Sequence, residues 1–80
     1  MPSAFVLVNT EVGSEETVLE KVKALGKVIE ARIVYGVYDI VCRIEAENMS
    51  ILKEYIADKI RKIDLIRSTL TLIVIEDKGK

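Results

Sequence analysis

Residues 28–45, VIEARIVYGVYDIVCRIE, contain two runs of β-branched residues separated by Gly36 and Val37. Because glycine at the first of two central positions suits a type II′ turn, this stretch predicts a β-hairpin. The turn would fix a register in which one face carries only apolar or aromatic pairs: Tyr35–Tyr38, Ile33–Ile40, Ala31–Cys42 and Ile29–Ile44. The opposite face would carry the pairs Val34–Asp39, Arg32–Val41 and Glu30–Arg43. A slip of one residue would mix the two faces, so the hairpin decides the fold.

The segments on either side of the hairpin add two helices and two strands. Residues 4–9 form a short apolar run that predicts a strand buried on both faces. Ser14 is a good N-cap for a helix that ends at Gly26, with apolar residues at helical spacing: Val18, Leu19, Val22 and Leu25. Asn48 is expected to cap a second helix that runs to about Arg61. Residues 66–75 predict the last strand, with Leu70, Leu72 and Val74 on one face and Thr69, Thr71, Ile73 and Ile75 on the other. A frayed tail is expected over residues 76–80.

The order β-α-β-β-α-β predicts a ferredoxin-like α+β fold, with both helices on one face of a four-stranded antiparallel sheet. The other face would be uncovered, although the outer strands carry apolar residues on both sides: Phe5 or Val6, Leu7 or Val8, Ile73 and Ile75. An exposed apolar face of this kind normally marks an interface. We therefore expect the sheets of two subunits to pack together as a dimeric α+β barrel.

Eighty residues are enough for one domain, spanning residues 1–80 without a linker, but give a small core. A single cysteine excludes an internal disulfide, and the lack of histidine removes the usual zinc ligands, so oligomerisation is the stabilising device that remains. The net charge of −1 gives no general attraction to nucleic acid or anionic membranes. No signal peptide or membrane span is visible, and a cytoplasmic location is expected. The absence of Gln, His and Trp beside abundant Ile, Val, Lys and Glu leans towards a thermophile.

Catalytic groups are scarce, so the chain is not expected to be an enzyme or to carry a metal or cofactor. Without histidine there is no Ser-His-Asp or Cys-His arrangement. Cys42 falls on the expected core face, where a thiol is normally inert. The isolated glycines do not form a phosphate-binding loop.

The hairpin segment is the candidate site: Tyr35, Gly36, Val37, Tyr38 and Asp39. It has two readings. In the structural one, Gly36 turns the chain, the tyrosines pair, and Asp39 meets Arg32 diagonally. In the functional one, a carboxylate, two phenols and open backbone groups hold a ligand with an ammonium and a carboxylate. The hydroxyls of the last strand are likewise either β-formers or ligand contacts: Ser68, Thr69 and Thr71.

Three segments together resemble one known family. Residues 4–10 (AFVLVNT), 36–40 (GVYDI) and 67–74 (RSTLTLIV) resemble the effector domain of the Lrp/AsnC transcription regulators, called RAM for regulation of amino acid metabolism. The resemblance covers essentially the whole chain. It implies a βαββαβ domain that forms dimers through its sheets and rings of dimers, commonly octamers. It also implies an amino-acid effector between neighbouring dimers, near the hairpin loop and the last strand.

Under this resemblance, Asp39 would bind the ammonium of the effector and the hairpin amides its carboxylate. The regulators also carry an N-terminal helix-turn-helix domain, which is not seen before residue 4, so direct DNA binding is not expected. The chain would act as an amino-acid-responsive oligomeric module, alone or by co-assembly with full-length Lrp/AsnC regulators. Two alternatives stay open: an assembly subunit without a ligand, and a small dimeric α+β barrel enzyme.

Overall fold

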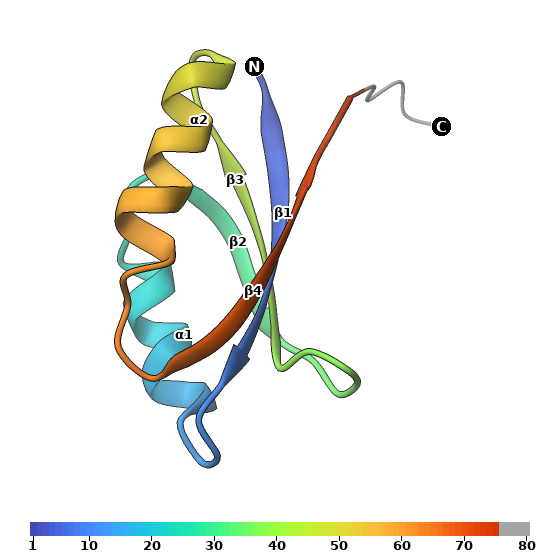
Figure 1. Ribbon diagram of the computed structural model, residues 1–80, viewed down its shortest axis with the longest axis vertical. Helices are drawn as coiled ribbons and strands as arrows, with labels where there is room; N and C mark the ends of the chain where they lie inside the picture. The colour runs from blue at the N-terminus through green and yellow to red at the C-terminus, as the bar shows by residue number, and fades with distance from the viewer. Residues whose placement is uncertain (76–80) are drawn as a thin grey trace.

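Two helices cover one face of a four-stranded antiparallel sheet in the computed structural model of this chain, which describes residues 1–75 (Figure 1). The frayed tail predicted for residues 76–80 lies outside the described residues. The elements follow in this order: β1 (Ser3–Thr10), α1 (Glu15–Lys23), β2 (Val28–Ile33), β3 (Ile40–Glu45), α2 (Met49–Tyr55), a π-helical continuation η1 (Ile56–Ile60) and β4 (Ile66–Ile73). The strands are arranged β2-β3-β1-β4. The predicted ferredoxin-like α+β fold is confirmed.

β1 lies inside the sheet, between β3 and β4, and its two faces differ. Ala4, Val6 and Val8 are fully buried on the helix side, whereas Phe5 is 37% exposed on the other side. The predictions that β1 is an outer strand and that it is buried on both faces are therefore wrong. Both helices lie on the same side, and no part of residues 1–75 covers the other side.

The hairpin register is confirmed over its central part. Ile33 pairs with Ile40, Ala31 with Cys42, Arg32 with Val41, and Glu30 with Arg43. The predicted Ile29–Ile44 pair is wrong, because a β-bulge at Ile29 leaves Val28 opposite Ile44.

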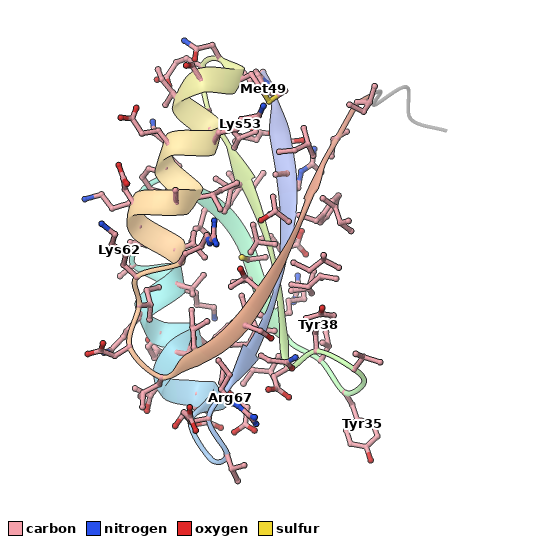
Figure 2. All side chains as sticks on the ribbon, viewed as in Figure 1. Tyr35, Tyr38, Met49, Lys53, Lys62 and Arg67 are labelled. Carbon is pink, nitrogen blue, oxygen red and sulfur yellow. The ribbon has the colours of Figure 1, made fainter. Side chains whose placement is uncertain are left out.

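The predicted two-residue turn is also wrong. The backbone N–H of Val34 donates to the carbonyl of Asp39 at 2.8 Å, which closes a wider loop. Gly36 is not among the residues with positive φ, which a type II′ turn requires at that position. Tyr35 is fully exposed, and Figure 2 shows it pointing in a different direction from Tyr38, so the predicted Tyr35–Tyr38 pair does not form.

The two helices begin in different ways. The side chain of Asn48 accepts a hydrogen bond from the Ile51 amide at 2.9 Å, which confirms the predicted cap of α2. Ser14 precedes α1 but makes no side-chain capping bond. α1 also ends at Lys23, before the predicted stop at Gly26, because the Leu25 amide donates to the Val22 carbonyl at 3.0 Å and tightens the last turn.

The core lies between the helices and the sheet. Its helix side consists of Val18 and Val22 from α1 and Leu52, Ile56 and Ile60 from α2 and η1. The sheet side consists mainly of residues from β1 and β3: Ala4, Val6, Val8, Ile40, Cys42 and Ile44. Within residues 1–75, no helix has the length and apolar character needed to cross a bilayer.

Candidate functional site

A pocket of about 460 Å³ lies at the end of the sheet where β1 finishes and β4 begins. We call it the end pocket; its lining is Asn9, Thr10, Val12, Glu15, Asp39, Arg67 and Ser68. These residues come from the end of β1, the loop after it, the start of α1, the hairpin loop and the start of β4. Segments far apart in sequence therefore bring polar and charged groups of both signs to one place.

Asp39 is fixed against β1 through both its backbone and its side chain. Its backbone N–H donates to the Val8 carbonyl at 2.9 Å. Its Oδ2 accepts from the Thr10 amide at 2.9 Å and from the Thr10 hydroxyl at 3.4 Å. The diagonal contact with Arg32 that the structural reading predicted is not formed, because the Arg32 Nε donates to Glu30 Oε2 at 2.8 Å. One oxygen of the Asp39 carboxylate thus holds the strand, and among the described residues nothing donates to the other.

Arg67 occupies an irregular position at the start of β4. Asn9 pairs with Ser68 but Thr10 pairs with Ile66, so Arg67 has no residue opposite it on β1. A bulge of this kind changes the direction of a side chain, and here it places Arg67 on the wall of the end pocket, beside the loop that follows β1 (Figure 2). Arg67 was not among the predicted site residues, since alternation along the strand gives no sign of the extra residue.

The charges of the end pocket are not neutralised by one another. No carboxylate oxygen in the described part of the chain lies within 4.0 Å of the Arg67 guanidinium. The ion pairs found in residues 1–75 are all elsewhere, at Lys27–Glu47, Arg32–Glu30 and Arg43–Glu45. The end pocket therefore presents a guanidinium and the carboxylates of Asp39 and Glu15 to solvent with space between them.

A second pocket of about 400 Å³ adjoins the first along the hairpin. We call it the hairpin pocket; its lining is Glu15, Glu16, Ile33, Val34, Tyr35, Gly36 and Asp39. Glu15 and Asp39 line both pockets, so the two spaces meet at these residues.

Comparison with known proteins assigns the chain to a family. The sequence matches the Lrp/AsnC ligand-binding domain over residues 3–78. This chain belongs to the Lrp/AsnC ligand-binding domain family. The resemblance found in the sequence is thereby confirmed, and the family is one of transcription regulators rather than enzymes.

Similar proteins of two lengths are known. A curated relative, the uncharacterized HTH-type transcriptional regulator PYRAB01370 of Pyrococcus abyssi, is 34% identical over 71 residues. Those residues are 89% of this chain but 45% of the relative, so this chain spans about half the length of the curated regulator. The crystal structure of FFRP-DM1 is 41% identical with a TM-score of 0.89, and the match covers 94% of this chain and all of that one. The structure of hypothetical protein PHS023 from Pyrococcus horikoshii is 40% identical with a TM-score of 0.88, and the match covers 98% of this chain and 94% of that one.

The Lrp/AsnC domain brings some of the predicted site residues together and separates others. Tyr35, Gly36 and Asp39 line the hairpin pocket, and Ser68 lines the end pocket, where it accepts a hydrogen bond from the Asn9 amide group at 3.3 Å. Val37, which is 85% exposed, and Tyr38 line neither pocket.

The predicted threonines lie on the opposite side of the sheet from Ser68. Thr69 pairs with Val8 and Thr71 with Val6, and these valines face the helices. Thr71 lines a separate pocket of about 280 Å³ between α2 and β4.

Cys42 is almost fully buried in this Lrp/AsnC domain, as predicted. Burial raises the pKa of its thiol from 9.0 to about 11. The Sγ–H also donates a hydrogen bond to the Val6 carbonyl at 3.5 Å. At neutral pH the thiol is therefore protonated and weakly nucleophilic.

The side of the sheet away from the helices carries a patch that we call the open sheet face. It contains Phe5, Leu7, Val41, Leu70 and Leu72. Phe5 lies opposite Leu72, and Leu7 lies opposite Leu70, so these side chains are neighbours on one face. Leu70 and Leu72 are 43% and 48% exposed. The Arg43 guanidinium lies 5.6 Å from the centre of the Phe5 ring and borders the patch on the β3 side.

Proposed function

We propose that this domain binds a free α-amino acid in the end pocket and couples that binding to its own assembly. The observation that carries the proposal is the pair of opposite charges, Asp39 and Arg67, which line one pocket without forming an ion pair. A zwitterion placed between them would give its ammonium to Asp39 and its carboxylate to the planar fork of Arg67. Asp39 thus keeps its predicted role as the partner of the ligand ammonium. The ligand carboxylate is instead assigned to Arg67, whereas the sequence predicted the hairpin amides for it.

The geometry of Asp39 suits this role. Because Oδ2 is engaged by Thr10, the carboxylate has a fixed orientation, and Oδ1 remains as an acceptor for a ligand ammonium. Ser68 adds a hydroxyl at the same pocket. The other predicted site residues do not line the end pocket, and they would contact the ligand only from outside it or from a neighbouring subunit: Tyr35, Gly36, Val37, Tyr38, Thr69 and Thr71.

A related fold supports an amino acid as the ligand. The transcriptional regulator NMB0573 of Neisseria meningitidis, whose structure was determined as a complex with L-Met, matches 99% of this chain with a TM-score of 0.85 and 14% identity. At that identity the likeness concerns the fold, so the ligand class is carried to this chain as part of the proposal.

The open sheet face supports the assembly half of the proposal. A second copy packed sheet to sheet would cover Phe5, Leu7, Leu70 and Leu72, which no part of residues 1–75 covers. Dimers joined near the hairpin loops into an octamer-like ring would bring the pockets of neighbouring subunits together. Effector binding would then shift the assembly equilibrium by its difference in affinity for the two states.

Regulation of transcription would follow from assembly rather than from DNA contact by this domain. The chain has a net charge of −1, which gives little attraction to phosphates. Its effect on genes of amino acid metabolism would come from co-assembly with full-length Lrp/AsnC regulators in the cytoplasm.

Calorimetric titration of the purified chain with each common amino acid tests the proposal. We expect one or a few amino acids to bind, Arg67→Gln to weaken that binding at least about tenfold, and Arg61→Gln to leave it unchanged. Arg61 is the matched control because it is an exposed arginine that lines a different pocket. Binding that is equally sensitive to both substitutions contradicts the role of the end pocket.

Light scattering with and without the bound amino acid tests the coupling to assembly. A change in the size distribution supports regulation. An oligomer of constant size that binds no amino acid would instead support the alternative of a ligand-free assembly subunit, which the open sheet face alone would explain.

A further inference from the structure

The two adjoining pockets contain more negative than positive charge. Glu15, Glu16 and Asp39 contribute three carboxylates, whereas Arg67 contributes one guanidinium. None of the three carboxylates forms an ion pair in the described part of the chain. After a zwitterion has matched Arg67 and Asp39, the carboxylates of Glu15 and Glu16 are left without a cation.

These two carboxylates lie where the side chain of a ligand would extend. Glu15 and Asp39 are shared by both pockets, so a ligand held at Asp39 in the end pocket would have room for its side chain in the hairpin pocket. The path is bordered by Ile33 and Val34, which are 42% and 40% exposed. The exposed ring of Tyr35 lines the same space.

The hairpin pocket thus combines aliphatic walls, an aromatic ring and two carboxylates. Aliphatic walls suit methylene groups, a carboxylate pair suits an ammonium or guanidinium, and a tyrosine ring adds a favourable face for a cation. A divalent metal ion fits less well, since residues 1–75 contain no group of three or more carboxylate, cysteine or histidine side chains close enough to hold one.

We infer that the effector is an amino acid with a long basic side chain, such as lysine, whose terminal ammonium binds Glu15 and Glu16 in the hairpin pocket. This inference rests on the proposed function, because it specifies the ligand of the same site. In this arrangement Arg67 and Asp39 hold the main-chain groups of the ligand, Ile33 and Val34 cover its methylene groups, and Glu15 and Glu16 select its charge.

Calorimetry with lysine and norleucine tests the selection of charge, because norleucine has the same aliphatic chain without the terminal ammonium. We expect lysine to bind at least about tenfold more tightly than norleucine, as a charge-assisted hydrogen bond predicts. The preference should shrink as salt is raised, because exposed ion pairs are screened. Norleucine or leucine binding as tightly as lysine would overturn the inference and leave the proposed function standing. Binding of no amino acid at all would overturn both.

Substitutions on α1 assign the preference to particular side chains. Glu16→Gln, which alters only the hairpin pocket, should reduce the ratio of lysine to norleucine affinity several-fold, and the double change Glu15→Gln/Glu16→Gln should remove most of it. Glu20→Gln is the control, because Glu20 is an exposed carboxylate on the same helix that lines neither pocket. A ratio that responds equally to Glu20→Gln and to Glu16→Gln would show a general effect of net charge and overturn the assignment.

Discussion

The backbone N–H of Thr10 donates a 2.9 Å hydrogen bond to Oδ2 of Asp39, so a carboxylate at the end of the hairpin loop fixes the end of β1. The residue proposed to bind the ligand ammonium therefore also stabilises the fold. Thr10 is 4% exposed, and an amide left without an acceptor at such a position costs about 1–3 kcal/mol. Asp39 consequently has two roles, which substitutions can separate.

Asp39→Ala and Asp39→Asn should differ in stability but not in binding. Alanine removes the acceptor for Thr10 and should lower the free energy of unfolding by about 1–3 kcal/mol. Asparagine keeps an oxygen acceptor and should cost less than half of that, while its lost charge weakens amino-acid binding as strongly as alanine does. Urea denaturation and calorimetry measure the two effects. Asparagine binding the ligand like the parent chain would exclude Asp39 as the ammonium partner.

The start of α2 offers a second test, with a natural control at α1. Asn48→Ala removes a side-chain acceptor that lies 2.9 Å from the Ile51 amide and should cost about 1 kcal/mol of folding free energy. Ser14→Ala should cost only a few tenths of a kcal/mol, because Ser14 makes no side-chain capping bond although it occupies the corresponding position. Denaturation curves for the two variants compare the caps directly, and equal losses would contradict the observed difference.

Leu65 has a φ of +76°, a left-handed conformation that costs a residue with a Cβ about 1–2 kcal/mol. Its carbonyl accepts from the Glu11 amide at 2.8 Å, which ties the loop after β1 to the start of β4. Leu65→Gly should therefore be more stable than Leu65→Ala by about 1 kcal/mol. At Lys21, an exposed position within α1, the same comparison should favour alanine. If the alanine variant is more stable than the glycine variant at both positions, the loop relaxes around residue 65 and carries no strain there.

The sequence contained enough information for the order of elements, the hairpin register and the position of Asp39. Apolar alternation defines which side of a strand is buried, so the pairs Ala31–Cys42 and Ile33–Ile40 could be predicted. Asp39 was predicted as a site residue because the hairpin combines a carboxylate with two phenols and open backbone groups at the edge of an expected interface.

The bulges could not be predicted in the same way. At Ile29 and at Arg67 one extra residue enters a strand without a glycine or proline to mark it. The consequence at Ile29 is a shifted pair, and at Arg67 it is a charged side chain placed in the end pocket. The two-sided burial predicted for β1 failed for another reason, since no part of residues 1–75 covers Phe5 on the side of the sheet away from the helices.

Cys42 provides a test in alkaline solution. Its thiol has a pKa raised from 9.0 to about 11 in the folded chain, so the unfolded state loses the proton first as pH rises. The buried thiol therefore contributes at most on the order of 2–3 kcal/mol to the free energy of unfolding. This contribution is fully present below pH 9 and is lost as the pH rises towards 11. The difference in unfolding free energy between the parent chain and Cys42→Ala should therefore decrease over this range. A difference that is constant with pH would show that the buried thiol does not titrate differently on folding.

The last prediction concerns the role of the open sheet face in assembly. Leu72→Glu places a charge opposite Phe5, in the centre of the surface proposed to pack against a second copy. Burying an unpaired carboxylate at that interface would cost several kcal/mol, so the variant should dissociate. Light scattering should then show monomers. Val12→Glu introduces the same charge at a residue that is 92% exposed and lies outside the open sheet face, at the end pocket, so it should leave the sheet-to-sheet dimer intact and give no monomer. If Leu72→Glu stays oligomeric while Val12→Glu dissociates, the copies associate through the loops at the end of the sheet instead of through the sheet itself.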